Sequence, residues 1–289
     1  MSEDDLSPVS TSRRVWQLAW PTIISNLLFT TVGFAHIKIV SGLGNSAVAA
    51  VTSGHRIFFL IQAVLMGLSI ATTAMVARSW GGKRIAEAEM VAWTSVALGL
   101  ALGLLLSLPA LFVPETVAMV FGLDAETTKQ TARFIFWLGV FNGFSALNMM
   151  LSTSLRATGD VITPLCFLFF SSVLNVSFGY MLAHGIGGLP AFGVAGVAFG
   201  GSFAAAIVAC VFASFWWRGK FNIKALKQWR IDLPTARQLI TIGAPSVLEQ
   251  GFIQVAFLAF FAIVGQYGTA SYAAYGIGIS IVSFSIVVG

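Results

Sequence analysis

Apolar residues gather in eight long stretches that are nearly free of charged side chains. Each stretch has at least 21 residues, and only the seventh contains a charged residue, Glu249. The stretches are continuously apolar rather than alternating, which is typical of membrane-spanning helices and not of the strands of a membrane barrel. The pattern therefore predicts an all-α polytopic membrane protein. The stretches lie at 15–35, 57–77, 90–113, 134–155, 161–183, 193–217, 239–265 and 267–289.

Composition supports a lipid environment and excludes several other classes. The 289 residues are 57% apolar and 9% charged, whereas soluble domains carry about 25% charged residues. The two cysteines, Cys166 and Cys210, lie inside apolar stretches and are interpreted as small hydrophobic residues. We find no phosphate loop, HExxH sequence or cofactor motif, so we expect no enzyme, no metal site, no bound cofactor and no nucleic-acid partner.

Basic residues predict the orientation in the membrane. Twelve of them fall in the N-terminal region or in loops on its side, and four fall on the opposite side: Lys38, Arg56, Lys129 and Arg133. Because cytoplasmic loops carry an excess of Lys and Arg, we expect a plasma (inner) membrane protein with a cytoplasmic N-terminus.

An internal repeat divides the chain. When the sequence is shifted by 224 residues, ten identities occur between 15 and 65, among them Pro21 with Pro245 and Gly44 with Gly268. Six stretches separate the two copies, so both would have the same orientation. We predict an N-terminal six-helix bundle over 1–217, a basic cytoplasmic linker over 218–238, and the first two helices of an incomplete C-terminal bundle over 239–289. The remainder of that bundle is then an expected partner; the alternative is a natural eight-helix protein.

Five stretches along the chain, in their order, carry a family resemblance. They are IVSGLGNSAVAA (39–50), VARSWGGKRIAEA (76–88), SLRATGDVITPL (154–165), LNVSFGYMLAHGIGGLPAFGVAGV (174–197) and GAPSVLEQ (243–250). With them the chain resembles the multidrug and toxic compound extrusion (MATE) family of transporters. The third stretch has the residues of the family's cytoplasmic loop motif: Arg156, Gly159, Asp160 and Pro164.

The resemblance implies two six-helix bundles around a V-shaped cavity. It also implies a secondary active antiporter that exports drugs or other, often cationic, small molecules in exchange for protons or sodium by alternating access. Two alternatives stay open: a flippase for lipid-linked precursors, which has a related fold, and a non-transporting fragment or half-transporter. A flippase needs a cationic cavity for pyrophosphate, and we expect Lys38 to be the single deeply placed base.

The resemblance also points to candidate coupling residues, with two departures from the family pattern. His36 stands where the family usually has a cation-binding aspartate, and Gly179 stands where many members have a second aspartate, four residues after Asn175. A histidine titrates near neutral pH, so proton coupling remains possible at His36. Sodium binding through this position is not expected, because a neutral imidazole is a poor ligand for a hard cation.

Further candidates lie in or next to the apolar stretches. Ionisable and polar groups at membrane depth are functional candidates because burying them there is costly. Lys38 is expected on another face from His36, and Pro21 and Pro245 are candidate hinges because an internal proline bends a helix. The full set of cavity candidates is His36, Lys38, Asn175, Glu249 and Gln254, with Phe29, Phe34 and Phe58 as a possible apolar wall.

Overall fold

The computed structural model describes residues 8–188, 190–225 and 232–288, and these residues form helices and connecting turns without a β-strand. Within the described residues, seven of the predicted stretches each fall mainly on one helix, and the fourth falls on two. The long helices are α1 (Pro8–Val40), α2 (Asn45–Gly81), α3 (Ile85–Phe112), α5 (Ala125–Val140), α6 (Asn142–Ala157), α7 (Ile162–His184), α8 (Val194–Trp217), α9 (Leu233–Gly265) and α10 (Thr269–Val288). Short elements complete the set: η2 (Ser41–Leu43), α4 (Pro114–Ala118) and η3 (Met119–Phe121).

The predicted stretches and the observed helices differ in several places. The predicted 134–155 span is broken at Phe141 into α5 and α6, which are bent by 53°. Helix α2 begins at Asn45, twelve residues before the predicted start at 57. Helix α9 begins at Leu233, inside the predicted linker, because Asp232 caps it by accepting a hydrogen bond from the backbone N–H of Thr235.

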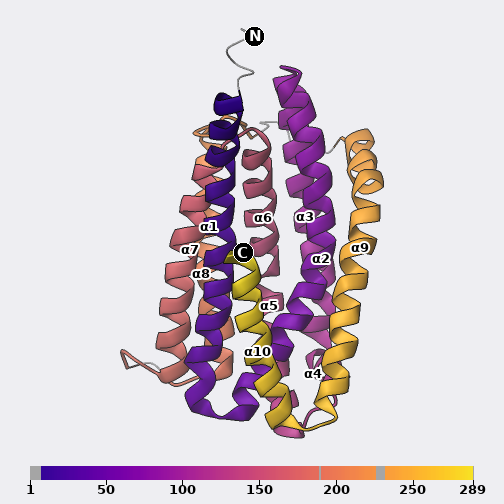
Figure 1. The fold of residues 1–289 in the computed structure, drawn as a ribbon. Helices are drawn as coiled ribbons and strands as arrows, with labels where there is room; N and C mark the ends of the chain where they lie inside the picture. The colour runs from indigo at the N-terminus through magenta and orange to yellow at the C-terminus, as the bar shows by residue number, and fades with distance from the viewer. Residues whose placement is uncertain (1–7, 189, 226–231, 289) are drawn as a thin grey trace.

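The helices are long and apolar enough for a multi-pass membrane protein. Six of the described helices qualify by length and composition, or seven if the bent α5–α6 pair is one span. In Figure 1, α1, α7 and α8 form one side of the molecule and α2, α3 and α9 form the other, with α10 between them. Helix α1 packs on both α7 and α10, while α9 packs along α2.

Glycines let the helices approach closely at two interfaces. A Cβ at Gly200 of α8 would lie 2.6 Å from the carbonyl carbon of Phe178 in α7, and one at Gly243 of α9 would lie 3.0 Å from the carbonyl oxygen of Gly67 in α2. Membrane helices gain no hydrophobic driving force from one another, so small residues stabilise them by permitting such backbone contact.

Helices α1 and α9, which begin the two copies of the predicted repeat, have several features in common. Helices α1 and α9 each contain 33 residues and an internal proline, Pro21 and Pro245. The residue before the next helix is in both copies a glycine with positive φ, 103° at Gly44 and 96° at Gly268. Glycine suits this turn because other residues rarely adopt that conformation.

Replacing Gly200 by alanine tests the close α7–α8 packing. We expect Gly200→Ala to destabilise the protein by about 1–3 kcal/mol, because the added methyl group must push the two backbones apart. Thermal denaturation in detergent measures the effect. Gly251→Ala in α9 is the control, since a Cβ there meets nothing within 4 Å; equal stability of the two variants would contradict the packing argument.

Asp124 joins the start of α5 to the start of α10. It caps α5 by accepting a hydrogen bond from the backbone N–H of Thr127 (2.9 Å), and it accepts another from the hydroxyl of Thr269. The hydrogen bond from Thr269, followed by that from Thr127, holds the pKa of Asp124 below its ordinary value. A depressed pKa means that this stabilisation is present above the unfolded pKa and is lost as pH falls through the folded one.

The Asp124 contact predicts a pH-dependent effect on stability. We expect Asp124→Ala to lower the thermal midpoint near neutral pH, with a cap loss of about 0.5–2 kcal/mol. The difference from the unsubstituted protein should shrink as pH falls below about 4, where the carboxylate of the unfolded chain is protonated. A difference that stays constant down to the acid limit would contradict this assignment.

Candidate functional site

A cavity of about 510 Å³ opens between the helices. Its described lining comes from α1, α2, α5, α6, α7, α8 and α10, so residues far apart in sequence meet there. The volume falls in the range of small-molecule sites, which is about 300–1,000 Å³. Phe29, Phe34 and Phe58 are all part of the lining, in agreement with the predicted apolar wall.

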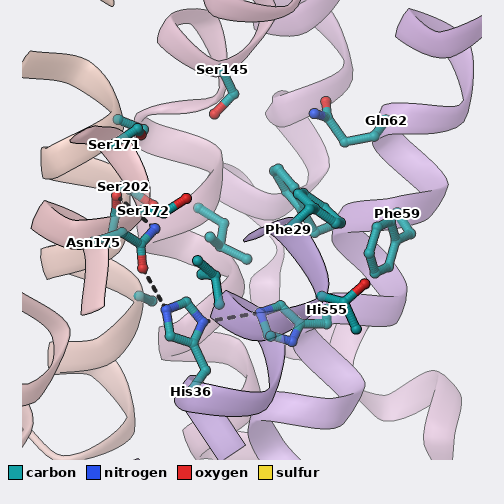
Figure 2. A pocket seen from close by; sticks show the side chains of 18 of the residues that line it. Phe29, His36, His55, Phe59, Gln62, Ser145, Ser171, Ser172, Asn175 and Ser202 are labelled. Atoms are coloured by element: carbon teal, nitrogen blue, oxygen red, sulfur yellow. Dashed lines mark hydrogen bonds between the residues drawn. The ribbon is translucent and has the colours of Figure 1, made fainter. Parts of the chain in front are cut away.

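His36 lies at the centre of a hydrogen-bonded chain across the cavity (Figure 2). Its Nε2 is 2.6 Å from Oδ1 of Asn175 in α7, and its Nδ1 is 3.4 Å from Nε2 of His55 in α2. The His36 side chain is buried, whereas His55 and Asn175 are half-buried. The chain therefore connects three helices, α1, α2 and α7.

The Asn175 amide is held in one orientation by α8. Its Nδ2 donates a hydrogen bond to the carbonyl oxygen of Gly201 (3.2 Å), which turns Oδ1 toward His36. Gly201 permits this contact, because a Cβ there would lie 2.9 Å from the amide. An acceptor facing Nε2 requires that this nitrogen carry the hydrogen, so the amide orientation selects the Nε2–H tautomer of neutral His36.

The tautomer limits how many protons the two histidines hold. With Nε2–H donating to Asn175, the lone pair on Nδ1 of His36 accepts from Nε2–H of His55, and Nδ1 of His55 is left without a proton. One additional proton fits on that atom. A second would place two N–H groups against each other across 3.4 Å, which electrostatic repulsion excludes.

Arg56 follows His55 on α2 and also lines the cavity. Its guanidinium carbon lies 4.8, 5.4 and 5.8 Å from the ring centroids of Phe261, Phe257 and Phe59. The first two rings belong to α9, so this cation connects α2 to α9. Ring faces stabilise a guanidinium but do not neutralise it.

Three predicted cavity residues lie away from the lining. Lys38 is exposed near the end of α1 and, as expected, on a different face from buried His36. Glu249 is exposed on α9, and Gln254 is half-buried on the same helix. None of the three is among the residues that line the cavity.

The loop motif is structural in this arrangement. Nη2 of Arg156 donates a hydrogen bond to the hydroxyl of Ser25 (3.1 Å), and that hydroxyl donates to the carbonyl oxygen of Pro21 (2.8 Å), inside α1. Asp160 accepts from the backbone N–H of Thr163 (3.0 Å) at the start of α7. Gly159 has a φ of 91°, and Pro164 is buried in the first turn of α7.

Pro245, the other hinge candidate, is exposed on α9.

Sequence reasoning missed His55 and misplaced Arg56. The prediction that Lys38 is the single deeply placed base is wrong, because Arg56 lines the cavity while Lys38 is exposed. The count of basic residues used to predict the orientation placed Arg56 in a loop, but Arg56 lies inside α2. The apolar run AVAAV at 47–51 was a signal that α2 starts early enough to carry both residues inward.

A family model named MatE matches residues 21–181, which is more than half of the chain and includes all three residues of the hydrogen-bonded chain. The chain belongs to the MatE family. As a MatE protein it is an integral, multi-pass membrane protein of a transporter family, in agreement with the resemblance recognised in the sequence.

Curated relatives share the MatE sequence over most of this chain. The probable multidrug resistance protein NorM of Bradyrhizobium diazoefficiens is 29% identical over 92% of the chain and 57% of its own length. The multidrug export protein MepA of Staphylococcus saprophyticus is 26% identical over 91% of the chain and 58% of its own length. The chain thus spans somewhat less than two thirds of the relatives it matches.

Solved structures confirm the MatE fold. A MATE protein crystallised in complex with MaD3S superposes with a TM-score of 0.78, at 21% identity, over 95% of this chain and 63% of its own. A MOP superfamily transporter from Pyrococcus furiosus superposes with a TM-score of 0.75, at 20% identity, over 95% of this chain and 67% of its own. The binding pocket of that protein is described as having reverse polarity, which suggests a different function for it.

Substitution of Asn175 tests the hydrogen-bonded chain. We expect Asn175→Ala to destabilise this MatE protein by about 1–3 kcal/mol, because it leaves the buried Nε2–H of His36 without an acceptor. Thermal denaturation measures the loss. Ser171→Ala is the control, since Ser171 lies one turn earlier on α7 and lines the same cavity; an equal loss in both variants would contradict the role of the amide.

Proposed function

We propose that this protein is a proton-coupled secondary transporter that moves small organic molecules through the central cavity by alternating access. The observation that carries the proposal is the chain from Asn175 through His36 to His55, which places two titratable imidazoles in the cavity wall. The geometry leaves Nδ1 of His55 open to one additional proton, and in this proposal the pair takes up and releases that proton during a transport cycle.

The coupling ion in this proposal is a proton rather than sodium. Sodium, like other hard cations, prefers carboxylate, carbonyl and water oxygens as ligands. Within the described residues the cavity is lined by no aspartate or glutamate, and His36 presents ring nitrogens. The amide oxygen of Asn175 is already engaged by His36.

Movement in the proposal comes from α1, the helix that carries His36. Pro21 removes one backbone hydrogen bond from α1, and Arg156 of α6 reaches the same turn through Ser25. A shift of α1 relative to α6 and α7 would change which side of the membrane His36 faces. The proposal includes the inner membrane as location and a cytoplasmic N-terminus, on the ground of the loop charges.

A lipid-linked precursor flippase fits less well. Pyrophosphate recognition uses several cationic donors, and the described cavity lining offers one guanidinium and two imidazoles that are largely engaged with each other and with Asn175. The lining also includes six phenylalanines that suit a compact aromatic body: Phe29, Phe34, Phe58, Phe59, Phe167 and Phe212.

Reconstitution in liposomes tests proton coupling. An imposed pH gradient should drive flux of an organic dye, with a matching proton flux reported by a pH-sensitive dye inside. We expect His36→Gln and His55→Gln to abolish the pH-driven component, because neither glutamine can titrate, while replacing sodium by choline changes nothing. Cationic rhodamine and anionic carboxyfluorescein serve as the two dyes.

The third histidine supplies the matched control. His184 is exposed at the end of α7, so His184→Gln removes an imidazole without touching the cavity. Proton-driven flux that survives in both His36→Gln and His55→Gln, or that disappears equally in His184→Gln, would reject the proposed site.

A further inference from the structure

The cavity has an unusual charge for a site expected to bind cations. Its described lining contains Arg56, His36 and His55, and no carboxylate. The acidic candidate, Glu249, is exposed on α9 and does not line it. At membrane depth the charge of a ligand has to be met by the protein, since lipid offers little solvation.

Arg56 supplies a charge that no anion among the described residues compensates. Among the described residues it forms no ion pair, and its Nε is buried without a hydrogen-bond partner. Its contacts are instead with the faces of Phe59, Phe257 and Phe261. A guanidinium has five N–H donors and recognises carboxylates, sulfonates and phosphates through two parallel hydrogen bonds.

The polar surroundings of Arg56 do not change this balance. The phenol groups of Tyr272 and Tyr275, on α10, interact electrostatically with Arg56. The hydroxyl of Ser53 donates a hydrogen bond to the Tyr272 oxygen. On α7 and α8 the described lining is neutral, with Asn175 and Ser202 among it. An organic cation in the cavity would meet like charge, whereas an organic anion would meet a guanidinium and an apolar aromatic wall.

We propose that the cavity binds amphipathic organic anions, that Arg56 recognises their charge, and that anion and proton bind together. The part about the proton rests on the His36–His55 proton site of the function proposed above, though not on transport itself; the part about the anion does not rest on that function. A proton on the His36–His55 pair adds positive charge next to the bound anion, so each favours the other by thermodynamic linkage. Anion and proton then occupy the same state of the cavity and move in the same direction.

The sign of this linkage separates the proposal from cation exchange. When a cationic ligand displaces a proton from an acidic site, binding releases a proton. Here the ligand carries the opposite charge, so binding takes up a proton. The two mechanisms therefore predict opposite signs for the change in bound protons, and this sign does not depend on how strong the coupling is.

Calorimetry with three matched ligands tests the anion site. The protein is placed in nanodiscs of neutral phosphatidylcholine and titrated with a naphthalene sulfonate, a naphthalene methanol and a naphthylmethylammonium. We expect the sulfonate to bind at least about tenfold more tightly than the ammonium, as a charge-assisted hydrogen bond predicts. Arg56→Gln should remove this preference and leave affinity for the neutral methanol unchanged, which also shows that the cavity is intact.

Two further variants sharpen the test. Arg56→Lys keeps the charge but not the planar fork, so it should retain the preference for the sulfonate with lower affinity. Lys38→Gln removes an exposed charge near the end of α1 and should change nothing. A preference for the ammonium, or a sulfonate preference that persists in Arg56→Gln, would overturn the proposal.

Calorimetric titration with the sulfonate in two buffers of different ionisation enthalpy measures how many protons the protein takes up or releases when the ligand binds. At about neutral pH, where an ordinary imidazole is partly protonated, the sulfonate should cause net proton uptake that His36→Gln and His55→Gln abolish. Proton release would overturn the joint binding. The protein could prefer the sulfonate and take up protons on binding it, yet show no pH-driven flux in liposomes. That result would support this inference and reject the proposed transport.

Discussion

The orientation of one amide group determines what the cavity can do. Asn175 donates to the carbonyl oxygen of Gly201 and so directs its own oxygen at His36. That contact assigns the hydrogen of neutral His36 to Nε2 and makes Nδ1 an acceptor for His55. If the amide were turned around, His36 would present its lone pair to Asn175 and could no longer accept from His55, and the two imidazoles would not act as one proton site.

The packing of α7 on α8 keeps the amide in place. Gly200 and Gly201 are adjacent on α8; the first lies against the backbone of Phe178 and the second against Asn175. Small residues at this interface therefore stabilise the bundle and also bring a carbonyl oxygen within hydrogen-bonding distance of the site. In the proposed function, stability and proton binding therefore depend on the same close contact, which leaves little freedom to substitute either glycine.

Much of the fold was predictable from the sequence because a membrane imposes continuous apolar spans. The repeat stays a prediction from the sequence, in which Pro21 and Pro245, and Gly44 and Gly268, recur at the same spacing; in the structure both glycines have positive φ. The break at Phe141 was missed, although the Asn142–Gly143 dipeptide that directly follows it is typical of a turn. Helix ends were similarly misplaced where charged residues lie inside a helix.

The site was predictable only in part, for the same reason. His36 and Asn175 stood out by comparison with the family pattern, and the structure brings them into contact. His55 and Arg56 did not, because charged and polar residues at the edge of an apolar stretch were assigned to a loop. Only the structure, in which α2 begins at Asn45, places them beside the cavity. The early start of α2 therefore brings a cation, Arg56, to a cavity that was expected to contain the acidic Glu249.

Nitrogen-15 NMR of the histidine side chains in lipid bilayers tests the central claim most directly, because chemical shifts report which ring nitrogen carries the hydrogen. We expect neutral His36 to carry it on Nε2, and on acidification we expect the two rings together to gain a single proton, on Nδ1 of His55. Exposed His184 serves as the internal reference. Hydrogen on Nδ1 of neutral His36, or independent protonation of both rings, would contradict the account.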